Sequence, residues 1–522
     1  MTSADSLDPR TPVIVGVGQV AERVTDPGYR MLSPAALAIE AASYALADSG
    51  ADSVALGAAI DTLAAVRQFD ISTPISFSPF GKSTNIARSI AAGIGADPTR
   101  AILEVVGGQC PQHLIGELGT SIRAGKSEVA LIVGAEAIST VRHLAAAEDK
   151  PDWSEDPGGS LEDRGFGLRG IVTLEPVRHG LLDAPLQYSL LEHARRARLG
   201  LSRDDYAATM GELFAPLTVV AAANPLSAAP ETRTASELVE VTERNRMVTD
   251  PYTKFLVARD QVNQGAAVLM MSIAAARRLG VPEDRWVFVH GQADLAEKSI
   301  LDRPDLGAYP SGVRAVEHAL ATAGIGVDDL AAIDLYSCFP IAIFSICDGL
   351  GLATNDPRGL TVTGGLPYFG GAGNNYATHA IAEIVARMRS DPGTYGLVGA
   401  NGGMLSKYSA GIYSSIPVAW PSIDVSEIQA ELDAVPPALS TTTPDGWATI
   451  ESYTVTYGRA GSNVVVIGKL EATGDRFLAN PAEGDDQILA LLTGADEPLG
   501  ARIFVRSFGY GNRVTRTRER MD

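Results

Sequence analysis

A glycine-rich segment at residues 364–379, GGLPYFGGAGNNYATH, carries the first candidates for chemistry. Asn375 and His379 are four positions apart, so a helix starting here would place both side chains on one face. Glycines ahead of a helix N-terminus let the backbone approach a ligand and aim free N–H groups at an oxyanion. The segment therefore predicts a ligand site, with His379 as a neutral base or donor. The alternative is a plain loop-to-helix junction with a capping or core histidine.

The chain has three cysteines, Cys110, Cys338 and Cys347, whose spacing predicts neither a disulfide framework nor a zinc site. Cys110 follows a strand-like run and precedes a helix expected from Pro111. The N–H groups of that helix would lower the thiol pKa, which is the setting of a nucleophile. The alternative is a small buried residue near a pocket. His113 lies three residues further on, but this spacing aims it along the helix instead of across a cleft.

The elements that must position these residues begin with alternating strands and helices. β-branched runs predict strands, and Ala-rich patterns with capping residues predict helices. In the first half of the chain we expect strands at residues 13–17, 102–106 and 129–133, and helices at 34–49 and 111–124. This order predicts parallel βαβ units and an α/β fold.

Residues 141–254 break this rhythm with Pro and Gly clusters, charged helices and no obvious strand, and they predict a loop domain inserted over the active-site face. The first half is then residues 1–140 with 255–275, including a strand at 262–272. A second half, residues 276–424, repeats the order loosely. We expect its strands at 286–290, 332–336 and 396–399, its helices at 312–323, 340–349 and 375–389, and a turn at 400–405.

The last part of the chain, residues 436–522, predicts a separate small β-rich domain that is barrel-like. A linker at residues 435–445, VPPALSTTTPD, precedes it. Three runs are β-like, and one short helix is expected at residues 486–492; the β-like runs are 448–457, 463–470 and 503–508. An arginine-rich tail follows, which is either a binding patch or a solvated, frayed end; it contains Arg513, Arg516, Arg518 and Arg520.

Composition limits the kinds of partner. The 522 residues are 46% hydrophobic and 20% charged, with a formal net charge of −20. This charge argues against nucleic acid or an anionic membrane as the main partner. An anionic small molecule remains compatible, because backbone dipoles can outweigh net charge inside a pocket. The polar N-terminus and the shortness of the apolar runs predict a cytoplasmic protein with reduced thiols and no membrane span.

Several segments, in the same order along the chain, resemble the thiolase superfamily over roughly residues 12–424. Residues 103–140 are similar to the strand, nucleophile turn, helix and strand of that family, and 262–272, VNQGAAVLMMS, to its Asn-Asp-Gly-Ala-Ala strand. Residues 361–375 and 400–404 resemble its two late glycine-rich turns. Residues 336–339, Tyr-Ser-Cys-Phe, resemble the His-Asp-Cys-Phe motif of sterol-carrier-type thiolases. The resemblance implies a five-layer α/β/α/β/α fold of two similar halves that binds CoA thioesters.

The family needs a nucleophilic Cys, an activating His, an acid/base Cys and an oxyanion-hole residue. The resemblance puts these roles at Gly108, Gly371, Gly399 or a neighbour, and Tyr336, so all four have lost the expected chemistry. Sliding the match by two residues would make Cys110 the nucleophile. That slide would rotate the following helix by about 200° and turn its apolar face out of the core.

Three functions compete. The first is a thiolase-like protein that binds CoA or acyl-CoA without classical thiolysis. The second is an enzyme with shifted residues: an acyltransferase using Cys110, or an aldolase-type C–C lyase using Tyr336 with His379. The third is a scaffold whose C-terminal domain recruits a protein partner. No metal or covalently bound cofactor is expected, and the oligomeric state stays open. The residues expected to bind the ligand are Gly370, Gly371, Asn375, Gly402 and Gly403.

Overall fold

The structure, a computed structural model, describes residues 4–167, 174–457 and 462–521. The first sheet of the body has the strand order β1-β8-β4-β2-β3-β5. Strands β4, β2, β3 and β5 run parallel, whereas β8 is antiparallel to both β1 and β4. The parallel units expected from the sequence are therefore part of a mixed sheet. The strands are β1 (Pro12–Ala21), β2 (Thr62–Ala65), β3 (Arg100–Leu103), β4 (Val129–Ala137), β5 (Glu162–Asp163) and β8 (Asn263–Ser272).

The second sheet has the order β10-β11-β12-β9, with a parallel β10–β11 pair and antiparallel pairs elsewhere. Its strands are β9 (Phe288–Ala296), β10 (Leu330–Leu335), β11 (Tyr395–Gly402) and β12 (Lys407–Ser414). The sequence did not predict β2 or β12. The run TLAA of β2 is too short to show a period, and β12 follows directly on the turn after β11.

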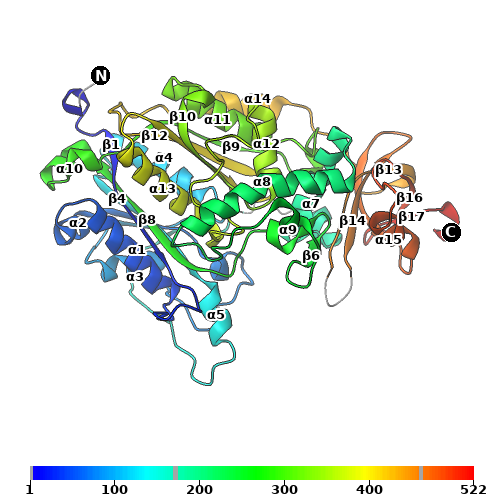
Figure 1. The fold of residues 1–522 in the computed structure, drawn as a ribbon, viewed down its shortest axis with the longest axis horizontal. Coiled ribbons are helices and arrows are strands. Elements are labelled where there is room, and N and C mark those ends of the chain that lie inside the picture. Colours follow the sequence, from blue (N-terminus) through cyan, green and yellow to red (C-terminus); the bar gives the residue numbers. More distant parts are fainter. Residues whose placement is uncertain (1–3, 168–173, 458–461, 522) are drawn as a thin grey trace.

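Helices complete five layers (Figure 1). Two of them, α4 (Cys110–Arg123) and α13 (Tyr376–Ser390), lie between the sheets, contact strands of both and touch each other. The outer face of the first sheet is covered by α1 (Pro34–Asp48), with α2 (Ser53–Ala59) and α3 (Ile86–Gly93) beside it. The outer face of the second sheet is covered by α11 (Pro310–Ala323), with α12 (Pro340–Leu350) packed on it, and α10 (Ile273–Arg278) follows β8.

Helices are the main regular structure of the inserted segment, and it also contains short strands where the sequence showed no obvious one. It contributes β5 and the hairpin of β6 (Met247–Thr249) and β7 (Tyr252–Thr253), which are too short to give a sequence pattern. Its helices are α5 (Ile138–Leu144), α6 (Leu174–Arg178), α7 (Ala184–Leu199), α8 (Arg203–Ala223) and α9 (Ala235–Val239). By length and composition α8 could cross a membrane, but it packs on α9 and α12 like the core helix of a globular body, so this is weak evidence.

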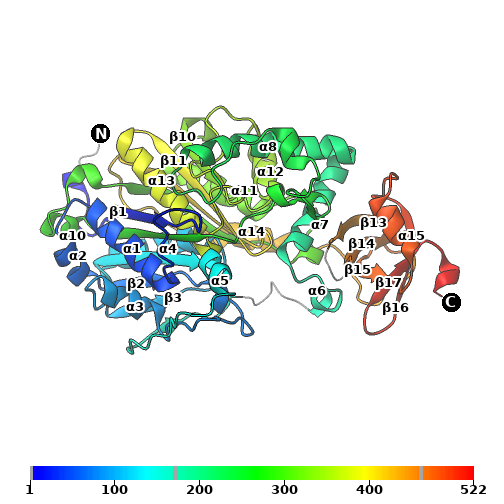
Figure 2. The same ribbon diagram turned by 60° about the horizontal axis from the view of Figure 1, so that its bottom comes forward.

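The C-terminal domain is a closed barrel with the order β13-β14-β15-β17-β16, as the barrel-like expectation required. Two of its strands, β15 and β17, were not predicted. Figure 2 shows the barrel at one end of the molecule, with α7 between it and the body. Arg513 lies in β17 and Arg520 pairs with Asp485, so the arginine-rich tail packs on the barrel. Helix α14 (Ser426–Ala434) precedes the barrel and packs on α11 of the body. The elements of the barrel domain are β13 (Asp445–Val455), β14 (Val464–Leu470), β15 (Arg476–Pro481), α15 (Asp486–Thr493), β16 (Arg502–Ser507) and β17 (Asn512–Thr515).

Candidate functional site

A cavity of about 660 Å³ opens where the ends of β10 and β11 meet the start of α4, the glycine-rich loop and the inserted segment. Each half of the body contributes to it. The first half supplies the turn before α4, and the second supplies the residues after β10 and the late turns. Residues on its wall include Val106, Gly107, Gly108, Tyr336, Cys338, Phe339, Leu366, Gly371, Asn374, Asn401, Gly403 and Met404.

Gly108 and Tyr336 face each other across this wall. A Cβ atom added at position 108 would overlap the Tyr336 hydroxyl oxygen, and it would lie 2.5 Å from Tyr336 Cζ and 2.7 Å from the Asn401 carbonyl oxygen. Such distances are far inside van der Waals contact. The phenol of Tyr336 therefore fills the space in which a nucleophilic side chain at position 108 would begin.

The Tyr336 hydroxyl is available to a ligand. Its ring packs edge-on against Tyr376 at 5.4 Å between centroids, and its hydroxyl forms no hydrogen bond with any residue that the structure describes. Burial raises the pKa of the phenol above its ordinary value, so the group stays protonated. It can donate a hydrogen bond to a carbonyl oxygen in the cavity.

A polar network forms the wall next to it. Asn401 donates from Nδ2 to the Tyr188 hydroxyl at 2.7 Å and to Cys338 Sγ at 3.8 Å. The Tyr188 hydroxyl in turn donates to the Gly403 carbonyl at 2.8 Å, and the Tyr309 hydroxyl donates to Asn401 Oδ1 at 3.2 Å. Burial raises the pKa of Cys338 to about 12. The one thiol on the described cavity wall is thus neutral at physiological pH.

The thiolase resemblance also assigned catalytic roles to Gly399 and Gly371, and these two positions leave different amounts of space for a side chain. At Gly399 a Cβ atom would overlap the hydroxyl of Tyr408, and Gly399 does not line the cavity. At Gly371 the nearest atom to an added Cβ is the Arg259 carbonyl oxygen at 3.3 Å. Tyrosine side chains therefore close Gly108 and Gly399, whereas at Gly371 a side chain would meet only the tight contact with the Arg259 carbonyl oxygen.

Cys110 lies behind the cavity wall. Its side chain is fully buried, its thiol donates to the Val105 carbonyl at 3.2 Å, and burial, together with Glu104, raises its pKa above the ordinary range. The lowering expected from the helix N-terminus is outweighed by desolvation. For His113 burial acts in the direction of a lower pKa. Its bonds to the carboxylates of Asp294 and Glu117 outweigh burial and raise the pKa of His113 to about 10. This geometry does not favour Cys110 as a nucleophile.

His379 is also buried away from the cavity. Its Nδ1 is 2.7 Å from Gln19 Oε1 on β1, and burial lowers its pKa to about 3. Asn375 ends the 3-10 turn η7 (Gly373–Asn375) and is the N-cap residue of α13, so it and His379 begin the same helix as expected, but their side chains bond different partners. Asn375 donates to the Gly134 carbonyl at 2.7 Å and holds β4 in place. These two residues serve packing between the layers.

The glycines expected to bind a ligand divide into two groups. Gly371 and Gly403 line the cavity, whereas Gly370 and Gly402 do not. Gly370 has a φ of +127°, and an added Cβ there would be 2.5 Å from Gln264 Oε1. At Gly402 an added Cβ would overlap the side chain of Gln109. Gly370 and Gly402 therefore allow the side chains of Gln264 and Gln109 to pack closely against the backbone.

Sequence reasoning missed three polar residues of the wall. Asn374 accepts from the Gly107 N–H at 2.9 Å and donates to the Arg67 carbonyl at 2.7 Å, so it fixes the approach to α4. Asn401 belongs to the segment ANGGM, and Asn374 is the neighbour of Asn375, so both lay inside motifs that had been recognised. Tyr188 comes from the inserted segment, where no motif pointed to it.

A basic recess of about 180 Å³ adjoins the cavity and shares Val257, Ala258 and Asp260 with it. We define the basic recess by its four cationic residues, Arg233, Arg246, Lys254 and Arg259. Arg233 pairs with Glu231, but the other three form no ion pair with a described residue, and Arg259 Nε is buried without a hydrogen-bond partner. In a chain of net charge −20 this is a local concentration of positive charge.

Two similar halves around two central helices, with a cavity at the ends of their strands, are the architecture of the thiolase fold. One solved structure, a monomeric SCP2-thiolase-like protein type 1 from Mycobacterium smegmatis, is 50% identical over 98% of this chain and 100% of that one, with a TM-score of 0.85. The chain therefore belongs to the SCP2-thiolase-like protein type 1 family. Residues 427–509 match the family described as the thiolase-like protein type 1 additional C-terminal domain.

More distant structures share the fold alone. An Ltp2-ChsH2(DUF35) aldolase is 18% identical over 78% of this chain and 98% of that one, with a TM-score of 0.55. Human mitochondrial 3-ketoacyl-CoA thiolase, solved in complex with CoA, is 16% identical over 78% of this chain and 99% of its own, with a TM-score of 0.52. A comparison with curated protein sequences finds no match.

Proposed function

We propose that this protein binds CoA or an acyl-CoA in the 660 Å³ cavity and does not perform classical thiolysis. The observation that carries the proposal is the contact between Gly108 and Tyr336, which leaves no space for a nucleophile. Thiolysis needs a thiolate that takes up an acyl group. Cys338 on the wall has a pKa of about 12, and Cys110 is buried behind it.

The chemistry of the cavity suits a thioester. Phe339, Leu366 and Val257 offer apolar contacts to an acyl or pantetheine chain. The Tyr336 hydroxyl offers a hydrogen bond to the thioester carbonyl oxygen. The basic recess beside the wall offers cations to the phosphates at the other end of the ligand.

Isothermal titration of the purified chain with CoA, acetyl-CoA and longer acyl-CoAs tests the proposal. Binding of at least one of them is expected, with the thioester recovered intact after the titration. The absence of heat for all of them would remove the binding function. Cleavage of a 3-ketoacyl-CoA with consumption of free CoA, giving two shorter thioesters, would remove the second half of the proposal.

A second candidate function is an aldolase-type C–C lyase. It is favoured by the free, protonated hydroxyl of Tyr336 on the cavity wall. His379 is not part of it, because that ring bonds Gln19 outside the cavity. Cleavage of 3-hydroxyacyl-CoA thioesters into a carbonyl product and a shorter thioester would support this candidate. Equal rates for wild type and Tyr336→Phe would count against it.

A further inference from the structure

A buried arginine of the barrel, Arg476, forms hydrogen bonds to the body. Arg476, on β15, is fully buried and forms two bonds of 2.7 Å to the carboxylate of Glu451 on β13. Its Nη1 donates to the backbone carbonyls of Leu301 and Arg303, at 2.9 and 2.5 Å. One side chain therefore ties two barrel strands to residues 301–303 of the body.

A second buried arginine continues this connection toward the cavity. Arg303 is 2% exposed, and its Nε donates to the Lys298 carbonyl at 2.9 Å. Its Nη2 donates to the carbonyls of Met404 and Leu405 at 2.9 and 2.8 Å. The planar fork of an arginine suits such a set of acceptors, whereas a lysine has a single nitrogen. Arg303 thus holds residues 403–406, which we call the cavity turn.

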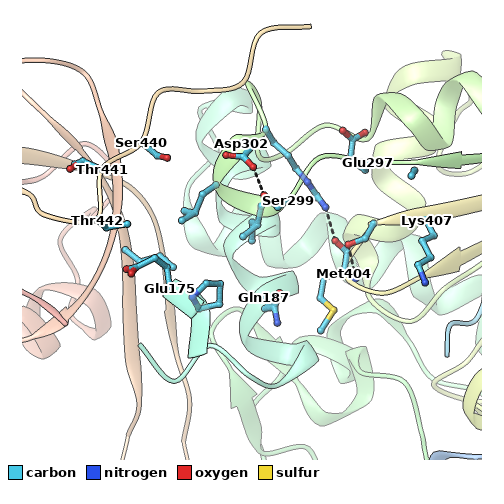
Figure 3. Close-up of a pocket in the computed structure, with 17 residues that line it drawn as sticks. Glu175, Gln187, Glu297, Ser299, Asp302, Met404, Lys407, Ser440, Thr441 and Thr442 are labelled. Atoms are coloured by element: carbon cyan, nitrogen blue, oxygen red, sulfur yellow. Dashed lines mark hydrogen bonds between the residues drawn. The ribbon is translucent and has the colours of Figure 1, made fainter. Parts of the chain in front are cut away.

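The cavity turn separates two spaces. On one side Gly403 and Met404 line the 660 Å³ cavity. On the other side lies a pocket of about 320 Å³ between body and barrel. Figure 3 shows Met404 and Lys407 on its body side, opposite Ser440, Thr441 and Thr442 on the barrel side. A shift of the cavity turn would therefore change the cavity wall.

The cavity turn is also bonded to the polar network of the site. Tyr188 donates to the Gly403 carbonyl, and the same hydroxyl accepts from Asn401, which contacts Cys338. Leu405 holds a φ of +49°, a conformation that costs free energy for a residue other than glycine and that the surroundings must impose. Hydrogen bonds from Arg303 to Met404 and Leu405 supply such a constraint.

We propose that Arg476 and Arg303 are positioning residues through which the C-terminal barrel fixes the cavity turn. The barrel is then an integral support of the ligand cavity instead of a separate recruiting module. This proposal does not depend on which ligand binds. It concerns the conformation of the wall, and it can be tested without any CoA compound.

The reactivity of Cys338 reports on this wall. Cys338 lies on the cavity, next to the network that the cavity turn supports, and it is 7% exposed. Its alkylation by iodoacetamide at fixed pH, resolved by peptide mass spectrometry, measures how often the wall opens. The variants are Arg303→Lys and Arg476→Lys, which keep the charge and lose the fork. Loss of roughly 1.4 kcal/mol of hydrogen bonding would raise the open population, and hence the labelling rate, about tenfold.

Arg196→Lys is the matched control. Arg196 is a buried arginine on α7 that bonds barrel residue Glu497 at 2.6 and 2.8 Å, so it also joins body and barrel, but it does not touch the cavity turn. The Arg196→Lys variant tests whether weakening any contact between barrel and body is enough to raise the labelling rate of Cys338. We expect Cys338 labelling in this variant to stay within about twofold of wild type.

Each outcome of the labelling experiment supports or overturns the proposal. Faster Cys338 labelling in both Arg303→Lys and Arg476→Lys, with the Arg196→Lys rate unchanged, supports the proposal. Rates in the two variants equal to those of wild type or of Arg196→Lys overturn it. If Arg303→Lys raises the labelling rate of Cys338 and Arg476→Lys does not, the barrel does not support the cavity turn and the proposal is overturned. Where Arg303→Lys does not fold, Arg476→Lys against Arg196→Lys carries the test alone.

Discussion

The hydroxyl of Tyr336 stands where the first side-chain atom of residue 108 would have to be. A cysteine at position 108 and a tyrosine at position 336 therefore cannot share this wall without a shift of one of them. The glycine at position 108 and the phenol of Tyr336 are therefore one structural feature. The consequence is a cavity whose centre offers a hydrogen-bond donor in place of a thiolate.

Gly108→Cys is expected to destabilise the protein by about 1–3 kcal/mol without producing thiolysis, because the new side chain overpacks against Tyr336. Urea denaturation measures the cost. In Tyr336→Ala the phenol is gone and the Asn401 carbonyl oxygen, at 2.7 Å from the added Cβ, remains as a close contact. The same glycine substitution is therefore expected to cost at least about 1 kcal/mol less in that background. Equal costs in the two backgrounds would show that the contact does not matter. Gly371→Ala, with its nearest neighbour at 3.3 Å, is the control and should cost less than Gly108→Cys.

The thiols are expected to react slowly and with a steep pH dependence. Burial raises the pKa of Cys338 to about 12 and that of Cys110 beyond the ordinary range. Since the thiolate is the reactive form, the alkylation rate of Cys338 should climb about tenfold per pH unit and show no plateau below pH 9 or so. Cys110, which does not line the cavity, should react more slowly than Cys338. A plateau near neutral pH for Cys110 would indicate an activated nucleophile and contradict the site described.

The sequence predicted the layers better than the site. Alternating strands and helices have clear periods, so α4, α13 and most strands of the two sheets were found, although β2 and β12 were missed and β9 extends to Ala296. The direction of a side chain depends on finer detail. Helix α4 begins at Cys110 itself, one residue earlier than expected, and the thiol lies against the Val105 carbonyl behind the wall. His379 lies in the first turn of α13, as expected, but its ring bonds Gln19 and does not line the cavity.

Residues far apart in the sequence were beyond such reasoning. The contact between Gly108 and Tyr336 joins the two halves of the body, and no local pattern reports on it. Tyr188 reaches the cavity from the inserted segment, and Arg476 reaches the body from the barrel. The partners of Tyr188 and Arg476 are backbone carbonyl groups, which have no signature in the sequence.

The buried carboxyl of Glu192 is expected to make stability depend on pH. It accepts hydrogen bonds from the hydroxyl of Tyr252 at 2.7 Å and the N–H of Ile341 at 2.8 Å, and burial raises its pKa from 4.5 to about 7. The folded state therefore binds this proton more tightly than the unfolded state. Its stabilising contribution is complete below pH 4.5 and is lost as the pH rises through about 7.

Glu192→Gln isolates this contribution. Between about pH 4.5 and 7.5 the free energy of unfolding of wild type should fall by about 3 kcal/mol relative to the variant. Chemical denaturation of both proteins over this range measures the difference. Other buried acids such as Asp334 titrate in both proteins and cancel. Parallel curves for wild type and variant would mean that Glu192 does not titrate in this window.

Affinity for a CoA compound is expected to depend on the basic recess and on salt. Removal of charge in Arg259→Met or Lys254→Met should weaken binding by about 1 kcal/mol each, and raising the salt from 0.05 to roughly 0.5 M should weaken wild type in the same direction. Arg244→Met, which removes an exposed cation of the same segment outside the recess, is the control. Titration calorimetry compares them. Equal weakening by Arg244→Met would assign the effect to net charge alone.

The most direct test of the central claim is the incubation of the purified wild-type chain with acetoacetyl-CoA and free CoA, followed by quantification of acetyl-CoA. We expect acetoacetyl-CoA to be bound and recovered unchanged, since no thiolate stands at the centre of the cavity. Sustained formation of acetyl-CoA by the wild-type chain would contradict this description of the site.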